Sequence, residues 1–568
     1  MPQHFLGRYD KMLDEADPDA QHSGMVNFAA HLAEAASLHY DLICDELDKK
    51  RMETNAMNIP GPFAKRSALP PEFAEADQLE INGILYDHEA AIEVPMHKVP
   101  VGKKIERILS IRSVKKDGRH KTRCAANNPE VPKHTRTQSP TLMSASMRSI
   151  CAMSANMEMC LAFRDFHLAY LNANLSPEEY FYCFPPTSAR QYDEHGQRLV
   201  WMVVKALYGA PFSGRKWYDT IRHWLIDYGF VPSDADPCVF VYKKKKYGKP
   251  HLIIGLYVDD MIIAYRDNVD LVALDVALLK DFMVKEVEPN FLSVEVDDNQ
   301  YYTTLTMTKY IERMITDIEL VPGPHHTPCD PSLADMVKTA KAKKHDVDTN
   351  IAKEYRRIVG KILYVCVMVR PDLAWSVGQL SQALTCPTSE LLAQARQVVS
   401  YLYNTRDLGL RYKKGDKSKM YGMSDANWTT SRSTSGWVFF LAGAFISGKS
   451  AKQLSIAMSS TEAEIMAASL AALEAVFLLA LYELCMGVKH GSVKLFVDNS
   501  GAVDMSKDYV ANNRTRHIER RHLKIRELVQ RSIIDTQWIK TDDNVADIFT
   551  KYLGRDKFKK FRSELLNM

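Results

Sequence analysis

The chain has 568 residues, enough for about three or four domains of ordinary size. Hydrophobic residues make up 46% and charged residues 25% of the sequence, which excludes a disordered chain and a small disulfide scaffold. The formal net charge of +3 is too small to indicate a polyanionic partner by itself.

The ten cysteines include no C-x-x-C pair, so the spacing does not favour a structural zinc site and fits a reducing compartment. The first residues lack the apolar core of a signal peptide, and no unbroken apolar run reaches the roughly 20 residues of a membrane helix. We therefore expect a cytoplasmic or nuclear protein that does not bind a membrane.

The first section of the chain has a helical period but no recognisable chemistry over residues 1–59, and the proline-dense stretch 60–71 is typical of a linker. A helix is predicted over 72–91. Residues 100–265 then mix short β-rich runs with helices, an α+β pattern rather than a regular βα alternation. The helices expected there are 142–163 and 214–229.

The helical signal dominates from 306 to 412, with a turn-rich interruption at 321–332. Another mixed section begins at about residue 418 with a strand that ends in "YGMSDANW". The elements predicted after it are a hairpin over 436–448, a long helix over 460–485 and a strand over 493–499.

Two adjacent carboxylates, Asp259 and Asp260, lie in "GLYVDDMIIAY" between apolar runs that predict a hairpin. A third, Asp165, stands at the start of the apolar-rich stretch "FRDFHLAYLNANL". Carboxylates that converge from separate strands make the oxygen-rich site that Mg²⁺ accepts, and the cation would neutralise their repulsion. Two metals about 4 Å apart can stabilise an attacking 3′ oxygen and a leaving pyrophosphate together.

A second set of acids lies in the last section, in the order strand, hairpin, helix, strand and helix. Its members are Asp425, Glu464, Asp498 and Asp547. Ser459 and Glu462 form a capping-box pattern that would occupy Glu462 at the start of the long helix. Glu464 lies on the other side of that helix, above a row of alanines that permits close approach to a sheet. We favour Glu464 as the site residue, and Glu462 stays the alternative.

Several motifs resemble, in order, those of the Pol polyprotein of copia-type LTR retrotransposons over roughly residues 70–555. They are "RDFHLAYLNANL", "KALYGAPFSGRKWYDTIRHWLIDYGFVPSDADPCVFV", "LYVDDMIIAY", "EYRRIVGKILYVCVMVRPDLAWSVGQLSQAL", "SDANWTTSRSTSGWVFFL", "SSTEAEIMAASLAALEAVFL" and "NVADIFTK". The resemblance implies an α+β right-hand polymerase followed by a connection-like region and an RNase H-like α/β domain. The divisions it implies are an unassigned segment 1–70, fingers and palm 71–300, thumb and connection-like region 301–417, and an RNase H-like domain 418–568.

The resemblance also implies residue roles. It assigns the polymerase metals to Asp165, Asp259 and Asp260, and a four-carboxylate, two-metal RNase H site to Asp425, Glu464, Asp498 and Asp547. Tyr170 takes the place of an aromatic residue that excludes a ribose 2′-OH, with a packed core tyrosine as the alternative. Lys121 and Arg123 match a pair that contacts the incoming triphosphate, with a solvated basic loop as the alternative; a guanidinium suits phosphate because its donors pair bidentately.

The activity so implied is RNA-directed DNA synthesis with degradation of the RNA strand of the hybrid. It needs two Mg²⁺ ions per site, dNTPs, an RNA template, a DNA primer and the RNA/DNA hybrid, and it is compatible with location in virus-like particles. The oligomeric state is not predicted. His517 and His522 are further candidates near the second site, and Arg370 is a candidate duplex contact or a structural partner of Asp372.

Two segments depart from the family pattern. Tyr208-Gly209-Ala210-Pro211-Phe212 stands where many members read "YGLKQ", and the segment after Arg123 differs from the common "LVARG" form. Two alternatives therefore stay open beside the active enzyme. One is a non-catalytic remnant that binds nucleic acid, and the other is a nuclease in which only the C-terminal site works.

Overall fold

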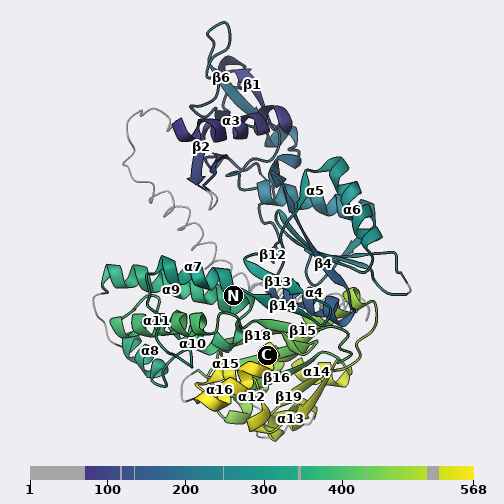
Figure 1. Ribbon diagram of the computed structural model, residues 1–568, viewed down its shortest axis with the longest axis vertical. Helices are drawn as coiled ribbons and strands as arrows, with labels where there is room; N and C mark the ends of the chain where they lie inside the picture. The colour runs from purple at the N-terminus through teal and green to yellow at the C-terminus, as the bar shows by residue number, and fades with distance from the viewer. Residues whose placement is uncertain are drawn as a thin grey trace.

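The computed structural model describes residues 71–568, apart from 115–117, 134, 247, 343–346, 430–431 and 508–523. The predictions for residues 1–70 and for His517 and His522 lie outside the described residues. The described chain folds into four sheets with helices packed against them, and the predicted α+β class is confirmed (Figure 1).

The first sheet stands at the top of Figure 1 and has the order β1-β6-β5-β2-β3. Its strands are β1 (Ala91–Pro95), β6 (Leu199–Val203), β5 (Phe181–Phe184), β2 (Ile105–Val114) and β3 (His120–Ala126). Helix α3 (Ala74–Asn82), within the predicted helix 72–91, holds β3 by buried carboxylates. Asp77 accepts from Thr122 at 2.6 Å, and Glu80 accepts from the Cys124 N–H at 2.9 Å. Because strand side chains alternate, Lys121 and Arg123 lie on the opposite face of β3.

The second sheet has the order β11-β4-β10-β9-β8-β7. Its strands are β11 (Val284–Glu286), β4 (Cys160–Phe166), β10 (Asp260–Tyr265), β9 (Leu252–Tyr257), β8 (Val239–Tyr242) and β7 (Phe230–Pro232). Helices α5 (Ser213–Tyr228) and α6 (Asn268–Asp281) belong to the same part of the chain, and α5 confirms the helix predicted over 214–229.

The helix predicted over 142–163 is too long. Helix α4 is Ser144–Asn156, and the chain then turns at Glu158, whose φ of 56° is left-handed and cannot continue a helix. The apolar residues after it form the buried strand β4. Asp165 consequently lies near the end of a strand and not at the start of an apolar stretch.

The third sheet brings together segments that are far apart in the chain. Its order is β12 (Asn290–Phe291), β13 (Val294–Asp298), β14 (Tyr302–Thr306) and β15 (Leu410–Lys413). Between β14 and β15 the predicted helical section is confirmed, and the segment 321–332 contains neither helix nor strand. The helices are α7 (Thr308–Asp317), α8 (Leu333–Ala342), α9 (Thr349–Met368), α10 (Ala374–Ser381) and α11 (Ser389–Asn404).

Arg370 is a structural residue, and its prediction as a duplex contact is wrong. Its side chain is fully buried and donates to both oxygens of Asp372, at 2.9 and 2.8 Å. The Tyr401 hydroxyl also donates to Asp372, at 2.7 Å. The alternative, a buried pair with Asp372, is confirmed.

The last sheet has the order β18-β17-β16-β19-β20, with β16, β19 and β20 parallel to one another and β17 and β18 antiparallel. Its strands are β18 (Ala444–Lys452), β17 (Thr434–Leu441), β16 (Tyr421–Asn427), β19 (Val493–Val497) and β20 (Ile534–Trp538). The helices here are α12 (Ser460–Met486), α13 (Ser500–Lys507), α14 (Lys524–Gln530), α15 (Asp547–Thr550) and α16 (Arg555–Leu566). The predicted hairpin and strand are confirmed.

Helix α12 confirms the helix predicted over 460–485. It is long and apolar enough to cross a membrane by length and composition, but most of it is buried inside the protein. Its small residues Ala468, Ala471 and Ala475 are buried, and the helix contacts β16, β17 and β19. This helix is therefore the core helix of the last sheet.

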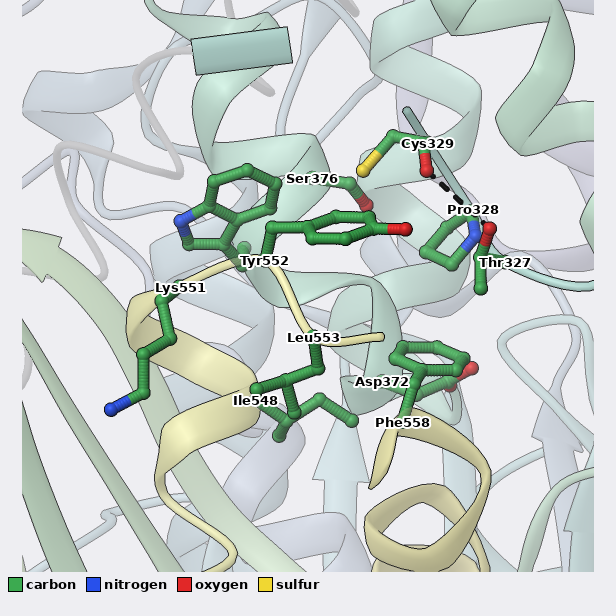
Figure 2. A pocket seen from close by; sticks show the side chains of 11 residues that line it. Thr327, Pro328, Cys329, Asp372, Ser376, Ile548, Lys551, Tyr552, Leu553 and Phe558 are labelled. Carbon is green, nitrogen blue, oxygen red and sulfur yellow. Dashed lines mark hydrogen bonds between the residues drawn. The ribbon is translucent and has the colours of Figure 1, made fainter. Parts of the chain in front are cut away.

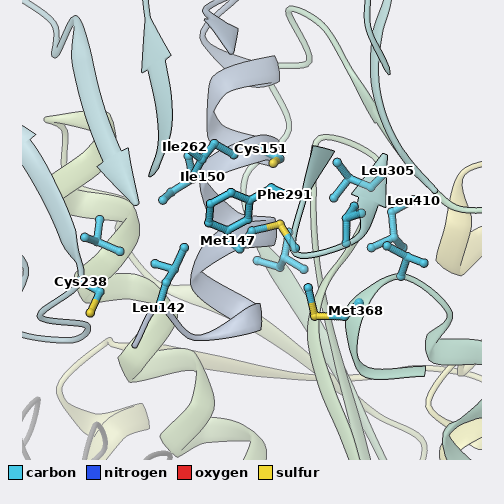
Figure 3. Close-up of a cluster of buried hydrophobic side chains, with 14 of the residues drawn as sticks. Leu142, Met147, Ile150, Cys151, Cys238, Ile262, Phe291, Leu305, Met368 and Leu410 are labelled. Atoms are coloured by element: carbon cyan, nitrogen blue, oxygen red, sulfur yellow. The ribbon is translucent and has the colours of Figure 1, made fainter. Parts of the chain in front are cut away.

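Helix α4 joins the second, third and last sheets into one continuous core. It contacts β9 and β10 of the second sheet, β14 and β15 of the third, and β18 and α12 of the last. Figure 3 shows Met147, Ile150 and Cys151 of this helix among side chains contributed by the other parts of the chain. The labelled side chains from outside the helix are Leu142, Cys238, Ile262, Phe291, Leu305, Met368 and Leu410.

Arg148 adds polar bonds to this junction. Its side chain is only 4% exposed, and it donates to the carbonyl of Ile446 at 2.7 Å and to that of Met368 at 3.3 Å, with a further bond to Val367. These acceptors belong to β18 and to the end of α9, so one guanidinium ties both to α4.

We expect Arg148→Met to lower the free energy of unfolding by about 3 kcal/mol, because it leaves buried carbonyls without their charged donor. Chemical denaturation followed by circular dichroism measures the change. Arg190→Met is the matched control, since Arg190 also donates to a carbonyl but is exposed. Equal effects of the two substitutions would contradict the role given to Arg148.

Candidate active sites

The first candidate site lies at the turn between β9 and β10. Tyr257 pairs with Asp260, so Val258 and Asp259 form a two-residue turn, and Val258 has a φ of 56° that β-branched residues rarely adopt. Two outside donors hold the turn. The Trp217 indole donates to the Val258 carbonyl at 2.6 Å, and the Phe166 N–H donates to the Asp259 carbonyl at 2.9 Å. Both carboxylates are thereby fixed at the edge of the sheet.

Asp165 reaches the same place from a separate strand. It is the direct partner of Asp260 in the antiparallel pair of β4 and β10. Residues so paired have Cβ atoms about 4.5–5.5 Å apart. On the other side of β4, Lys285 of β11 is opposite Asp165, and its Nζ lies 3.3 Å from Asp165 Oδ1. The structure thus brings the three predicted carboxylates together beside one lysine.

The electrostatics of this group show repulsion. Burial raises the pKa of Asp260 to about 6, and the neighbouring Asp259 and Asp165 add to the effect. Burial also raises the pKa of Asp259, while Arg123 and Lys121 oppose the rise. A divalent cation would relieve this repulsion, so the residues fit a metal. Within the described residues, however, these three do not form a set whose oxygens all lie within 4.8 Å of one another.

The basic strand of the first sheet faces this turn. The Arg123 guanidinium lies 5.2 Å from the centre of the Tyr208 ring, and that ring lies 5.0 Å from the ring of Tyr170. Gly209, at φ +86°, permits the approach, because a Cβ there would stand 2.0 Å from the carbonyl oxygen of Ala126. Tyr170 is therefore packed against a neighbour and also close enough to Asp259 for the two groups to interact electrostatically.

Phe212, at the segment that departs from the family pattern, is fully buried and makes an edge contact with Phe181 at 6.2 Å between ring centres. It serves the core that supports α5.

The second candidate site lies at the edge of the last sheet where β16 and β19 end. Because these strands are parallel, Asp425 near the end of β16 and Asp498 just after β19 meet at one edge. Helix α12 supplies the third acid. The Ala426 N–H donates to Glu464 Oε1 at 3.1 Å, which fixes Glu464 beside β16.

The oxygens of Asp425, Glu464 and Asp498 all lie within 4.8 Å of one another. Burial raises the pKa of Asp425 to about 7 and that of Glu464 well above its ordinary value. Glu464 Oε2 is buried and has no hydrogen-bond partner among the described residues. Three close carboxylates and an unpaired buried oxygen fit a divalent cation.

Glu462 lies at the start of α12 instead. Its N–H donates to Ser459 Oγ at 3.1 Å, and its carboxylate accepts from the Met458 N–H at 2.7 Å. This is the capping arrangement expected from the sequence, and it leaves Glu464 as the glutamate that meets the aspartates.

Asp547 lies next to this set and is held by lysines. Lys551 Nζ is 2.7 Å from Asp547 Oδ1 and 3.8 Å from Asp425 Oδ2, and Lys557 Nζ is 3.0 Å from Asp547 Oδ2. Thr550 donates to Asp425. In Figure 2, Lys551 extends away from the mostly apolar side chains around a small cavity between 327–329 and α15. The predicted four-carboxylate set is therefore three acids plus a fully buried, lysine-paired Asp547.

Sequence reasoning missed the lysines of both sites. The i,i+4 spacing of Asp547 and Lys551 is a signal that could have found one of them. No sequence signal could have identified Lys285 or Lys557, because each reaches its aspartate only through strand pairing or helix packing.

Comparisons with known proteins show which families the chain resembles. Residues 87–330 match the family described as reverse transcriptase (RNA-dependent DNA polymerase). The chain is 30% identical over 441 residues to the Pol polyprotein from transposon RE2 of Arabidopsis thaliana, covering 76% of this chain and 29% of the relative. It is 28% identical over 544 residues to the Pol polyprotein from transposon TNT 1-94 of Nicotiana tabacum, and the match covers 92% of this chain and 39% of the relative.

The chain spans only about a third of the length of these curated relatives. Among solved structures, the foamy viral protease-reverse transcriptase in complex with dsDNA is 11% identical with a TM-score of 0.45, covering 85% of this chain and 86% of that one. The same protein in complex with RNA/DNA hybrid is 12% identical with a TM-score of 0.41, and the match covers 85% of this chain and 56% of that one. Residues 87–330 therefore belong to the reverse transcriptase family, and over most of its length the chain is similar to Pol polyproteins of copia-type retrotransposons.

Proposed function

We propose that this chain copies RNA into DNA from a DNA primer at its first site and degrades the RNA of the hybrid at its second. Membership of the reverse transcriptase family supports the first activity, together with the pairing of Asp165 with Asp260. The close set of Asp425, Glu464 and Asp498 supports the second. We further propose the division into fingers and palm (71–300), thumb and connection-like region (301–417) and RNase H-like domain (418–568).

In the polymerase site, Asp165, Asp259 and Asp260 would hold Mg²⁺, which supplies charge stabilisation for the attacking 3′ oxygen and the leaving pyrophosphate. The chain's own residues orient the dNTP. Lys121 and Arg123 lie on the exposed face of β3 and act on the same carboxylate turn, where they would bind triphosphate oxygens. The Tyr170 ring packs against the Tyr208 ring, and Tyr170 would exclude a ribose 2′-OH.

In the second site, Asp425, Glu464 and Asp498 would hold Mg²⁺, which supplies an activated water for attack on the RNA phosphodiester. Lys551 forms ion pairs with Asp547 and Asp425 and so places a positive charge beside both acids. The Ala426 N–H keeps Glu464 aimed at the aspartates.

A second candidate function is a nuclease in which only the C-terminal site works. The tighter set of oxygens in that site favours it. The non-catalytic remnant receives less support, because Phe212, one of the two departures that motivated it, fills the core and leaves the carboxylates in place.

Primer extension on an RNA template and cleavage of an RNA/DNA hybrid separate these functions. We expect Asp259→Asn to abolish extension and keep cleavage, and Asp498→Asn to do the reverse, because the two acids belong to different sites. Asp227→Asn, at an exposed position, is the control. Loss of all activity with Asp498→Asn and none with Asp259→Asn would establish the nuclease alone.

The choice of glutamate has its own test. We expect Glu464→Gln to lower kcat for hybrid cleavage about 100-fold or more, because a metal ligand is worth several kcal/mol of transition-state stabilisation. Glu462→Gln removes a capping carboxylate and is expected to lower thermal stability while changing kcat less than threefold. The reverse order of the two kcat values would assign the site to Glu462.

The burial of Asp260 beside two other carboxylates predicts a pH dependence of stability. The pKa of Asp260 is about 6 in the folded chain and 3.8 as the ordinary value, so the folded state favours the protonated form. The free energy of unfolding therefore falls as pH rises from about 4 to 6. Above about pH 6, where Asp260 is ionised in both states, the whole of this destabilisation is present. We expect Asp260→Asn, in EDTA at pH 7, to raise the free energy of unfolding by about 1–2 kcal/mol after solvent screening.

The same variant should show a flatter dependence of Tm on pH between about 4 and 6. Added Mg²⁺ should raise the Tm of the original chain more than that of the variant, since it relieves repulsion that the variant lacks. A variant that is less stable than the original chain in EDTA would refute the repulsion.

A further inference from the structure

Two tryptophans differ from the rest. All seven tryptophans lie among the described residues, and Trp428 and Trp538 are the two that are exposed, at 46% and 55%. Both lie at the sheet edge that carries the second acid set. We call them the tryptophan pair.

The sheet places the pair on either side of Asp498. Trp428 directly follows β16, and Trp538 is the last residue of β20. Because β16, β19 and β20 are parallel, their ends meet at one edge, with β19 and the following Asp498 in the middle. Strands β16 and β20 are two strand spacings apart, about 10 Å. The pair therefore flanks the acids along this edge.

Each indole is oriented by its own N–H. Trp428 Nε1 donates to the Ala457 carbonyl at 3.0 Å, and Trp538 Nε1 donates to the Asp498 carbonyl at 3.2 Å. With the polar atom satisfied by the backbone, each ring presents an apolar surface to solvent. Exposed apolar side chains continue beside Trp428 in the loop that contains Ala457. They are Leu454, Ile456 and Met458. Contiguous exposed apolar surface of this kind marks a binding site.

Cationic side chains lie near the tryptophan pair and indicate an anionic ligand. Arg432 and Lys452 are exposed near Trp428, where Lys452 Nζ donates to the Arg432 carbonyl at 3.2 Å, and Lys540 is exposed two residues after Trp538. Aromatic rings beside cations are the arrangement that binds nucleic acid, the rings against sugars and bases and the cations against phosphates.

We propose that the tryptophan pair binds the RNA/DNA hybrid on both sides of the phosphate to be cleaved. The rings pack against sugars and base edges in the wide, shallow minor groove of the hybrid. Arg432 and Lys540 lie beside the flanking phosphates. This inference rests on the proposed RNase H function, and it assigns the substrate-binding surface of that site.

Tryptophan fluorescence tests the contact without catalysis. The full chain in EDTA is titrated with acrylamide in the presence and absence of an excess of RNA/DNA hybrid. We expect the hybrid to protect the exposed tryptophans from quenching. We also expect the protection to disappear in the double variant Trp428→Phe and Trp538→Phe, whose remaining tryptophans are not exposed.

Cleavage kinetics give the second readout. We expect Trp428→Ala and Trp538→Ala each to raise KM about tenfold, with a smaller change in kcat, because a ring contact contributes to binding. The Phe variants should restore most of the affinity and show that the fold is intact. Tyr192→Ala, which removes a 57% exposed ring from the segment between β5 and β6, is the control.

The outcomes separate the inference from the function it rests on. If the original chain cleaves the hybrid but the tryptophans are not protected and KM is unchanged, the tryptophan pair is not the binding surface. If no cleavage occurs but the hybrid protects the tryptophans, the contact stands and the RNase H function fails.

Discussion

Repulsion between carboxylates that the backbone forces together is the constraint on which both sites depend. Asp260 faces Asp165 because β10 and β4 are paired, and Asp425 meets Asp498 because β16 and β19 are parallel neighbours. The strand pairing fixes the backbone of Asp165, Asp260 and Asp425, so their carboxylates start from neighbouring positions. Burial, the largest cause, and the neighbouring carboxylates together raise the pKa of Asp260 and of Asp425, and this is the cost of keeping both groups ionised. Lysines already offset part of it, with Lys285 beside Asp165 and Lys551 beside Asp547.

The two sites share one scaffold. Helix α4 packs against the sheet that carries the first acids and against the sheet and helix that carry the second. Arg148 reinforces the junction from inside, through carbonyls of β18 and α9. Because this core is continuous, the two acid sets are held on one scaffold. That geometry suits a chain that copies a template and then removes it.

Much of this could be predicted from the sequence where a local period carries the information. The helical phase of α12 separated Glu464 from Glu462, and the apolar runs around Asp259 gave the hairpin. The end of α4 could not be predicted, because the apolar residues after Glu158 fit a helix as well as a buried strand. Nothing in the sequence around Arg370 predicts that its guanidinium is buried. Its burial and its bond to the Thr405 carbonyl, just after α11, follow from the packing of that helix. The partners of Asp165 and Asp547 depend on which strands and helices become neighbours, which no local period records.

The central claim is that each of the two carboxylate groups seats divalent ions. Crystals of the chain grown with Mn²⁺, measured for anomalous scattering at the manganese edge, test it most directly. The account predicts manganese between Asp165, Asp259 and Asp260 and separately among Asp425, Glu464 and Asp498, with Lys285 and Lys551 displaced or shared. Well-ordered carboxylates that hold no manganese at either place, with both lysines still seated on their aspartates, would contradict it.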